Sequence, residues 1–443
     1  MGPAFVAAIT AELDALIGPG RVDEQDFEAL EQALRHQVLE ITAQVMAQRF
    51  NADDSDHSGS TTACACGQTA RYAGRRPKTF TSVLGPLTLE RAYYHCDTCR
   101  AGVCPRDRAL GLHATSLSPG VLRMVGLAAS DFSFAAASDL LWELAAVRVE
   151  TKQVERAAEA LGREVADDER AVAETVPSPA PTMYLGLDGT GVPVRPTEVE
   201  GRRGKQPDGS AKTREVKLAT MWTAETRDKA GRPVRDRGSV SYNAAVESAA
   251  SRDTDPQPAA FAQRAYREAI RRGFDTAAQR VVIGDGAAWI WNIAAEHFPG
   301  AIEIVDIYHA KQHLCDVAKA IYGPGTDLAE RWARDRRAEL DAGRLCAVVA
   351  ALRIHVETTP EARKCIHYLF GNRHRMRYPQ FRAKGLCVSS GVVEAGCKQI
   401  GDRLKRAGMR WTVAGANAII ALRCCILSGR FEDFWERRAA NAA

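Results

Sequence analysis

The chain has 443 residues, which is enough for about three domains of ordinary size. Its hydrophobic content of 46% and charged content of 26% are those of a soluble globular protein. No apolar run approaches the roughly 20 residues that a helix needs to span a bilayer. The net charge of +4 permits nucleic-acid binding without requiring it.

The N-terminal sequence Met-Gly-Pro-Ala-Phe-Val lacks the basic region and the long apolar region of a signal peptide. We therefore expect a cytoplasmic location with no membrane contact. In that compartment the 12 cysteines are better explained as metal ligands or core thiols than as disulfides.

Residues 1–50 are expected to form a helical segment. Leu30, Leu34, Leu39 and Val45 recur among charged residues, and no Gly or Pro interrupts the stretch after Gly20. The polar run 51–62 that follows has the composition of a linker.

The segment 60–110 holds two closely spaced cysteine pairs: Cys64 with Cys66, and Cys96 with Cys99. They flank a basic, strand-like stretch, and cysteine pairs around a hairpin are typical of a zinc ribbon, in which four ligands surround Zn²⁺. The first pair is Cys-x-Cys where a ribbon usually has Cys-x-x-Cys, so His95 or Cys104 could replace a ligand. The alternative is a basic hairpin with reduced cysteines that bind no metal.

Residues 112–175 are expected to be helical. Ser118 before Pro119 is a typical helix start, and a second helix over 134–146 precedes a third that begins near residue 151. Two helices joined by a tight turn indicate either a DNA-binding helix-turn-helix or an ordinary helical hairpin. In the first case the residues facing DNA would be Thr151, Lys152, Gln153 and Arg156. The proline-rich run 176–181 is the predicted main domain boundary.

Residues 183–309 alternate between strand and helix patterns. The predicted order is strands at 184–194, 215–223 and 239–246, a helix at 258–272, a strand at 281–283, a helix at 287–298 and a strand at 302–307. The first three strands indicate an antiparallel meander, and the later strand–helix–strand spacing indicates a parallel pair. An α/β fold with a mixed sheet follows.

Residues 310–385 show no strand pattern and are predicted to be a helical insertion, after which 386–430 returns to the sheet-containing domain. Within it, 389–404 is predicted to be a helix whose apolar face carries Val393, Cys397, Ile400 and Leu404. Glu394 lies on a bordering stripe with Lys398 and Lys405.

Basic residues cluster between positions 373 and 410, where only Glu394 and Asp402 oppose them and Tyr378 precedes Trp411. This distribution favours a nucleic-acid interface over a solvated charged face. A second basic stretch follows Asp188. The candidate DNA-binding residues are Lys398, Arg403, Lys405, Arg406, Lys212 and Arg214.

Three carboxylates stand in unusual settings. Asp188 interrupts an apolar strand, Asp285 ends a later strand before a glycine, and Glu394 lies on the late helix. Mg²⁺ prefers carboxylate oxygens, and two such ions can support phosphoryl transfer, so the three acids are candidate metal ligands and catalytic residues. Each also has an ordinary explanation: a turn at Asp188, a helix cap at Asp285 and a favourable first-turn charge at Glu394.

Several stretches resemble transposases of the ISKra group of bacterial insertion sequences. They are the cysteine segment Leu84-Gly-Pro-Leu-Thr-Leu-Glu-Arg-Ala-Tyr-Tyr-His-Cys96, the run Gly186-Leu-Asp-Gly-Thr-Gly-Val-Pro193, the basic run 204–217, the run Ile283-Gly-Asp-Gly-Ala-Ala-Trp-Ile-Trp291 and the run Ser389-Ser-Gly-Val-Val-Glu394. The resemblance extends from about residue 64 to about residue 430.

This resemblance implies an RNase H-like core of the DDE type with a helical insertion, preceded by a helical and zinc-ribbon-like N-terminal region. Asp188, Asp285 and Glu394 would be the catalytic triad that uses Mg²⁺ or Mn²⁺, and Asp306-x-x-His309 would be a supporting motif. The expected activity is strand cleavage and strand transfer on transposon terminal inverted repeats and target DNA. A nucleoid-associated homo-oligomer is expected because transposon ends must be paired.

Two other functions remain open. A domesticated, non-catalytic DNA-binding protein would keep the fold without turnover. An actin-like-fold phosphotransferase would use Asp188-Gly-Thr-Gly191 as its first phosphate loop, but it also requires a second glycine-rich phosphate turn late in the chain, and none is evident.

Overall fold

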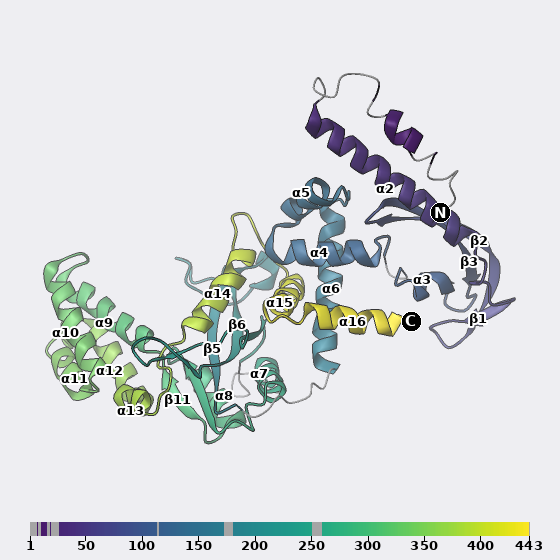
Figure 1. The fold of residues 1–443 in the computed structure, drawn as a ribbon. Helices are drawn as coiled ribbons and strands as arrows, with labels where there is room; N and C mark the ends of the chain where they lie inside the picture. The colour runs from purple at the N-terminus through teal and green to yellow at the C-terminus, as the bar shows by residue number, and fades with distance from the viewer. Residues whose placement is uncertain are drawn as a thin grey trace. The chain divides into compact units, whose positions relative to one another are not determined.

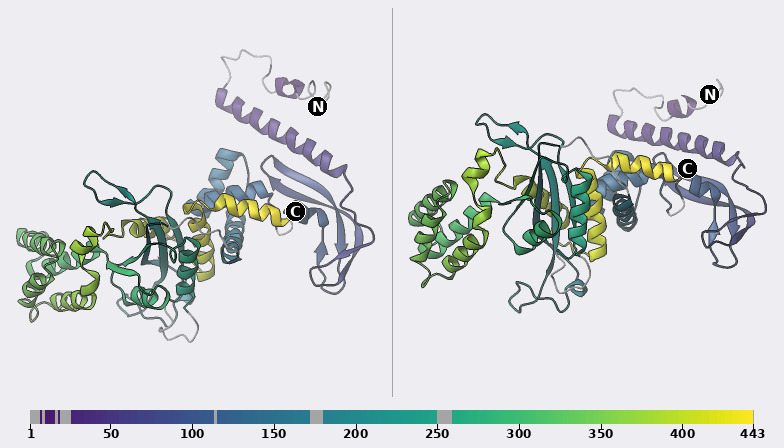
Figure 2. Two further views of the ribbon diagram at one scale, coloured as in Figure 1. Left: turned by 60° about the horizontal axis from the view of Figure 1, so that its bottom comes forward. Right: turned by 90° about the horizontal axis from the view of Figure 1, so that it is seen from below.

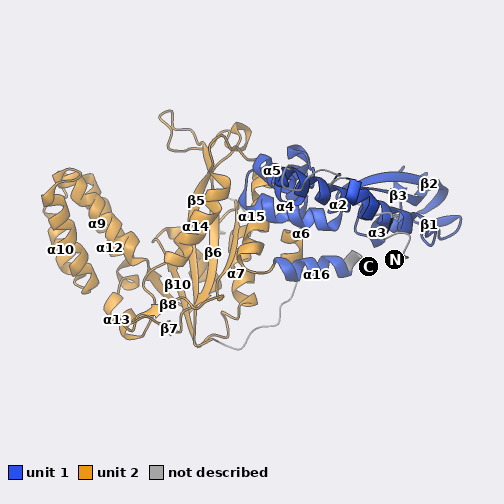
Figure 3. Ribbon diagram, turned by 45° about the horizontal axis from the view of Figure 1, so that its top comes forward, with its two compact units in different colours: residues 1–164, 431–443 blue, residues 165–430 orange. Residues whose placement is uncertain are grey.

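The computed structural model describes residues 7, 10–15, 18, 26–112, 115–171, 180–249 and 259–442. The chain divides into two compact units, Met1–Glu164 with Phe431–Ala443 and Val165–Arg430 (Figure 3). The division falls inside helix α6 (Thr151–Ala171), earlier than the boundary expected at 176–181, most of which lies outside the described residues. Within these ranges no single helix has the length and apolar composition required to cross a membrane.

The first unit begins with a long helix and a small antiparallel sheet (Figure 1). These elements are α2 (Phe27–Asn51), β1 (Thr61–Ala63), β2 (Thr69–Ser82), β3 (Gly85–His95), β4 (Gly102–Val103) and α3 (Pro105–Ala109). The strands pair in the order β1-β2-β3-β4. Buried Phe80, Leu87 and Leu89 of the β2–β3 hairpin pack with Leu112 and with Phe50 of α2. This apolar cluster anchors the hairpin whose far end carries the cysteine turns.

The rest of the first unit is helical: α4 (Pro119–Asp131), α5 (Phe134–Ala145), the start of α6, and α16 (Phe431–Ala442). The Ser118 side chain caps α4 by accepting from the Val121 N–H, which confirms the helix start predicted there. Between α5 and α6, Ala146 takes a left-handed conformation and the next residue, Val147, is buried. The tight connection matches the prediction, and DNA binding by α6 stays a prediction.

The second unit is built on one mixed five-stranded sheet with the strand order β11-β10-β5-β6-β9. Its elements are β5 (Thr182–Pro193), β6 (Thr213–Thr223), β9 (Ser241–Ala245), α7 (Ala260–Arg271), β10 (Gln279–Gly284), α8 (Ala288–His297) and β11 (Ile302–Val305). Strands β5, β6 and β9 form an antiparallel meander, while β10 runs parallel to both β5 and β11. The predicted meander and parallel pair are therefore confirmed, and the fold is mixed α/β.

Helices lie on both faces of this sheet (Figure 2). On β9, Ser241 bonds to Glu268 of α7, whereas the next residue, Tyr242, lies against Gly396 of α14 (Gly391–Leu404). Successive strand residues point to opposite faces, so α7 and α14 cover different faces. A Cβ on Gly186 of β5 would come within 2.0 Å of Val393, which shows how closely α14 crosses the centre of the sheet.

The described elements from residue 307 to 383 are all helical, as the sequence predicts. They are α9 (Ile307–Tyr322), α10 (Asp327–Asp341), α11 (Leu345–Arg353), α12 (Pro360–Asn372), a 3₁₀ turn (Arg373–Arg375) and α13 (Tyr378–Ala383). A small hairpin of β7 (Thr226–Arg227) and β8 (Pro233–Val234) follows β6, and α15 (Val413–Leu427) runs along the edge strand β9. The helical segment is inserted between β11 and α14, so α14 returns to the sheet after a long excursion (Figure 1).

Candidate metal centre and candidate catalytic carboxylates

Four cysteines of the first unit gather at one end of its sheet. The ligand atoms of Cys64, Cys66, Cys96 and Cys99 all lie within 4.8 Å of one another. The Sγ–Sγ distance is 3.5 Å between Cys64 and Cys99 and 3.7 Å between Cys66 and Cys96. A tetrahedron with Zn–S bonds of about 2.3 Å has edges of about 3.8 Å, so the four thiols fit a zinc ion.

Two short turns place these thiols. In the first, the Gly67 N–H donates to the Cys64 carbonyl; in the second, the Arg100 N–H donates to the Cys96 carbonyl. The Cys99 N–H is the largest of the contacts that lower the pKa of the Cys96 thiol to about 7, whereas hydrogen bonds from the neighbouring thiols raise the pKa of Cys99 to about 12 and contribute to a raised pKa at Cys66. A shared proton among close thiols gives this split, and a bound metal would replace that proton. The first turn presents both of its thiols with only one intervening residue, so the unusual Cys-x-Cys spacing does not prevent the arrangement.

The alternative ligands stand elsewhere. Cys104 lies before α3 and accepts a contact from Arg91 at 3.5 Å, and His95 Nδ1 lies 3.5 Å from the Tyr93 hydroxyl. Neither belongs to the four-thiol cluster. The four predicted cysteines therefore form the cluster that could hold a metal ion.

In the second unit, Asp188 lies within β5, opposite Leu218 of β6. It is not in a turn, which removes the ordinary explanation of its Asp-Gly sequence. Its side chain shares a sheet face with Gly186, the face that α14 covers. Asp188 Oδ1 accepts from the Gly189 N–H at 2.7 Å, and the Cys397 thiol of α14 donates to Oδ2 at 3.4 Å.

Asp285 follows directly after β10, where Gly284 is the register partner of Leu187 on β5. The next positions along these parallel strands are Asp285 and Asp188, so the two carboxylates are neighbours at the same level of the sheet. Asp285 Oδ1 also accepts from the Ala287 N–H at 2.8 Å and so supports the turn into α8. The ordinary and the functional explanations of Asp285 are therefore compatible.

The pair of aspartates concentrates negative charge in a partly buried place. Burial raises the pKa of Asp188, and the neighbouring charge of Asp285 raises it further, against the lowering effect of the Gly189 N–H and the Cys397 thiol. Neither aspartate forms an ion pair with a lysine or arginine among the described residues. The nearby His309 lowers the pKa of Asp188, so the basic side chain beside this pair is a histidine. Carboxylate oxygens are ligands that divalent cations prefer.

Glu394 stands in the first turn of α14, one turn before Cys397. Its side chain is 65% exposed and pairs with Lys398 at 2.8 Å, as the helical spacing predicts. Glu394 and Cys397 both line a surface cavity of about 680 Å³ that also reaches Thr190. Among the described residues, only the cysteine cluster gathers three or more potential ligand atoms, so the three acids are not assembled into one cluster.

A buried hydrogen-bond network fixes the start of α14. Asp306 is 5% exposed, caps α9 by accepting from the Tyr308 and His309 N–H groups, and receives the Ser390 hydroxyl at 2.6 Å as well as the Ser390 N–H. Ser390 therefore caps no helix with its side chain; it ties α14 to the end of β11. Asp306 is a positioning residue for the helix that carries Glu394, and the Asp306-x-x-His309 motif was the sequence signal for it.

The helical insertion contacts the loop that holds Asp285. The Tyr368 hydroxyl of α12 donates to the Asp285 carbonyl at 2.8 Å, and its ring lies 4.2 Å from that of His313 on α9. Gly286 has a φ of +102°, and a Cβ there would meet Tyr368 at 2.5 Å, so this turn requires glycine. Tyr368 was missed in the sequence because no spacing rule connects it with Asp285.

Most of the predicted DNA-binding residues are accessible in the second unit. Lys212, Lys398, Lys405 and Arg406 are exposed, and Arg214 is half-buried. The Lys405 ammonium also hydrogen-bonds to the Thr190 hydroxyl, two residues after Asp188. These positions leave their DNA-binding role as a prediction.

The prediction that Arg403 binds DNA is wrong. Its side chain is fully buried, its guanidinium carbon lies 5.1 Å from the centre of the Trp411 ring, and one of its nitrogens contacts the Met409 sulfur at 3.8 Å. On α14 it falls beside the apolar stripe, so packing takes it inward. It supports the connection after α14 and does not reach a DNA surface in this structure.

No protein-family model matches the chain, and no curated protein matches it significantly. The site must therefore be interpreted from its own residues.

Proposed function

We propose that this protein is a DNA transposase of the DDE type, in which Asp188, Asp285 and Glu394 carry metal-dependent strand cleavage and strand transfer. The observation that carries the proposal is the placement of Asp285, directly after β10, beside Asp188 of the parallel strand β5, under the helix that bears Glu394. Clustered carboxylates of this kind can hold the metal ions that support phosphodiester cleavage and transfer on DNA.

The sheet topology supports the proposal. An antiparallel meander of β5, β6 and β9, extended by the parallel strands β10 and β11, is the arrangement expected of an RNase H-like core. The first acid lies inside the first strand of the meander, the second follows the first parallel strand, and the third lies on a helix that crosses the sheet. The helical segment 307–383 matches the expected insertion before the last acid.

Asp188 and Asp285 would hold Mg²⁺ or Mn²⁺, with Glu394 completing the ligand set. A bound divalent cation would activate water as the nucleophile and stabilise the leaving oxygen. To join the site, Glu394 must release Lys398, an exposed ion pair worth less than about 1 kcal/mol. The Cys397 thiol must likewise give up its hydrogen bond to Oδ2 of Asp188. Both rearrangements are small because the donors are side chains on one helix.

The four cysteines of the first unit would hold a structural Zn²⁺, which stabilises the β2–β3 hairpin. We assign terminal-repeat recognition to this unit because the hairpin is rich in arginine and lysine, including Arg71, Arg76 and Lys78. Pairing of two transposon ends would require at least two copies of the chain.

The proposal is tested by a strand-transfer assay with Asp188→Asn, Asp285→Asn and Glu394→Gln on DNA that carries the ends of the element. Each substitution keeps side-chain size and removes one charge. We expect each to lower the rate by at least about 10³-fold while binding of the DNA ends is retained. Near-normal transfer by any one variant would remove that residue from the triad.

A non-catalytic DNA-binding protein is the second candidate, because the Glu394 carboxylate is paired with Lys398 and is not gathered with the two aspartates. This candidate predicts DNA binding by the wild-type chain with no metal-dependent cleavage at all. The same assay therefore separates the two functions.

A further inference from the structure

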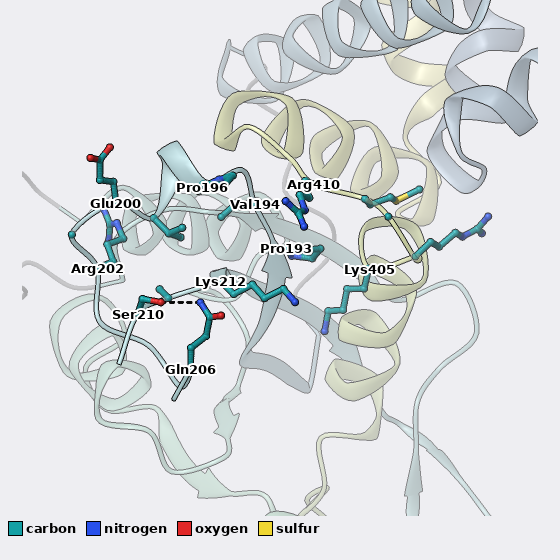
Figure 4. A pocket seen from close by; sticks show the side chains of 16 residues that line it. Pro193, Val194, Pro196, Glu200, Arg202, Gln206, Ser210, Lys212, Lys405 and Arg410 are labelled. Atoms are coloured by element: carbon teal, nitrogen blue, oxygen red, sulfur yellow. Dashed lines mark hydrogen bonds between the residues drawn. The ribbon is translucent and has the colours of Figure 1, made fainter. Parts of the chain in front are cut away.

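A wide groove opens in the second unit beside the end of α14 (Figure 4). It has a volume of about 830 Å³. One wall is the segment 193–212, which begins at the last residue of β5, and the other is the connection 405–410 between α14 and α15. We call it the basic groove, because its charged lining residues are Arg202, Lys212, Lys405, Arg406, Arg410 and one acid, Glu200.

The two walls are fastened together at their base. The Arg195 N–H donates to the Trp411 carbonyl at 2.8 Å, and the Trp411 N–H donates to the Pro193 carbonyl at 3.2 Å. The Val413 N–H donates to the Glu198 carboxylate at 3.1 Å. Backbone hydrogen bonds therefore hold together segments about 200 residues apart in sequence, and the groove is formed before any ligand binds.

Buried Arg403 supports the backbone connection at Trp411. Its guanidinium stacks on Trp411, whose indole N–H donates to the Leu404 carbonyl at 3.0 Å. The arginine excluded from a DNA contact thus shapes the wall that carries Lys405, Arg406 and Arg410.

The chemistry of the lining indicates a particular ligand. Five cations against one acid attract a polyanion, and none of the described lining residues is aromatic, so no ring is available to stack a nucleic-acid base. Lysine and arginine side chains around an open channel contact phosphates and carry no sequence information. Figure 4 shows Lys212 and Lys405 extending into the space from opposite walls.

The basic groove adjoins the cavity beside Glu394. Lys405 and Arg406 also line the cavity that contains Glu394 and Cys397. Lys405 is joined to Thr190, which shares β5 with Asp188. A strand bound along the groove would be led past Thr190 toward the acids.

From this geometry we propose that the basic groove holds the phosphodiester backbone of one DNA strand next to the site of cleavage, without reading its sequence. The proposal rests on the transposase function for the identity of the polyanion as DNA. It adds Arg202 and Arg410 to the interface and assigns Arg403 to its support.

The test is fluorescence anisotropy of a labelled 30-base-pair duplex of arbitrary sequence, titrated with the full-length chain in an Asp188→Asn background that prevents cleavage. The variants are Lys212→Gln, Lys405→Gln, Arg410→Gln and the triple combination. Lys229→Gln in the β7–β8 turn and Lys364→Gln on α12 are matched controls, since both are exposed and outside the groove.

Each groove variant should weaken binding about 8-fold at 0.1 M salt and lower the slope of log affinity against log salt by about 0.9. Lys405→Arg keeps the positive charge and should bind like the parent. A second duplex sequence should give the same affinities and salt slopes. The controls should bind like the parent. Unchanged affinity and slope in the triple variant, with its thermal unfolding midpoint preserved, would overturn the proposal, as would stronger displacement of the duplex by poly-L-glutamate than by unlabelled DNA.

The outcome is separable from that of the proposed function. Weaker binding by the groove variants, together with normal strand transfer by Asp188→Asn alone, would keep the groove and reject the triad. Unchanged DNA binding by the groove variants, together with loss of strand transfer by Asp188→Asn, would keep the triad and reject the groove.

Discussion

The two candidate sites of this protein differ in how far they are assembled. The four cysteines lie on two turns of one small sheet, and their thiols already stand at the spacing of zinc ligands. The three carboxylates come from a strand, the loop after a second strand, and a helix, and only Asp188 and Asp285 are neighbours. Glu394 points to solvent beside Lys398. Local turns can close a site by themselves, whereas a site built from distant segments depends on packing and on its ligand.

The largest effect of a substitution is expected at the four-cysteine cluster. Cys96→Ser should abolish zinc binding and unfold the β1–β4 sheet, because structural zinc in small modules contributes apparent binding energies of about 10–16 kcal/mol. Metal analysis should give one zinc per wild-type chain, and limited proteolysis should cleave the variant within 60–104. Cys104→Ser should keep its zinc; loss of metal in that control alone would assign the ligands differently.

The second prediction concerns the carboxylate site, where the hydrogen bonds of Asp306 hold the start of α14, the helix that carries Glu394. Asp306→Ala would leave the Ser390 N–H and hydroxyl without their acceptor and uncap α9, so we expect a loss of about 3 kcal/mol in the free energy of unfolding. Chemical denaturation measures this directly. Ser390→Ala removes only one donor and should cost about 1 kcal/mol; equal losses in the two variants would contradict the network.

A smaller effect concerns the charge on Asp188. Burial raises its pKa above the ordinary 3.8, so the ionised form disfavours the folded state. Below pH 3.8 the group is protonated in both states and has no effect; as the pH rises from 3.8 through the raised folded value, folded-state stability is lost. Asp188→Asn should therefore be more stable than the wild type at pH 7. The difference should shrink toward pH 4 in thermal unfolding, and a difference constant with pH would contradict this account.

Much of the architecture could be predicted from the sequence. Ser118-Pro119 marks a helix start because serine caps and proline fits the first turn, and the structure confirms it. The meander and the parallel pair followed from strand lengths and from glycine turns. The four cysteines were found because their spacing is local.

The failures share a physical cause. Arg403 was counted as a surface cation, but helix periodicity does not fix how deep the border of an apolar stripe is buried. The contact between Cys397 and Asp188 joins residues far apart in sequence, and only the packing of α14 at Gly186 creates it. The Glu394 side chain can point toward Lys398 or toward the two aspartates, and a sequence pattern contains no information about which orientation it takes.

Direct metal coordination by the aspartate pair is tested by Asp285→Cys in a cleavage assay on DNA carrying the ends of the element. A thiolate is a softer ligand that binds Mn²⁺ better than Mg²⁺. We predict that the variant loses cleavage with Mg²⁺ and regains it at least about 10-fold with Mn²⁺, while Asp285→Ala regains nothing. Wild-type rates with Mg²⁺, or the same low rate with both metals, would contradict a metal-holding role for Asp285.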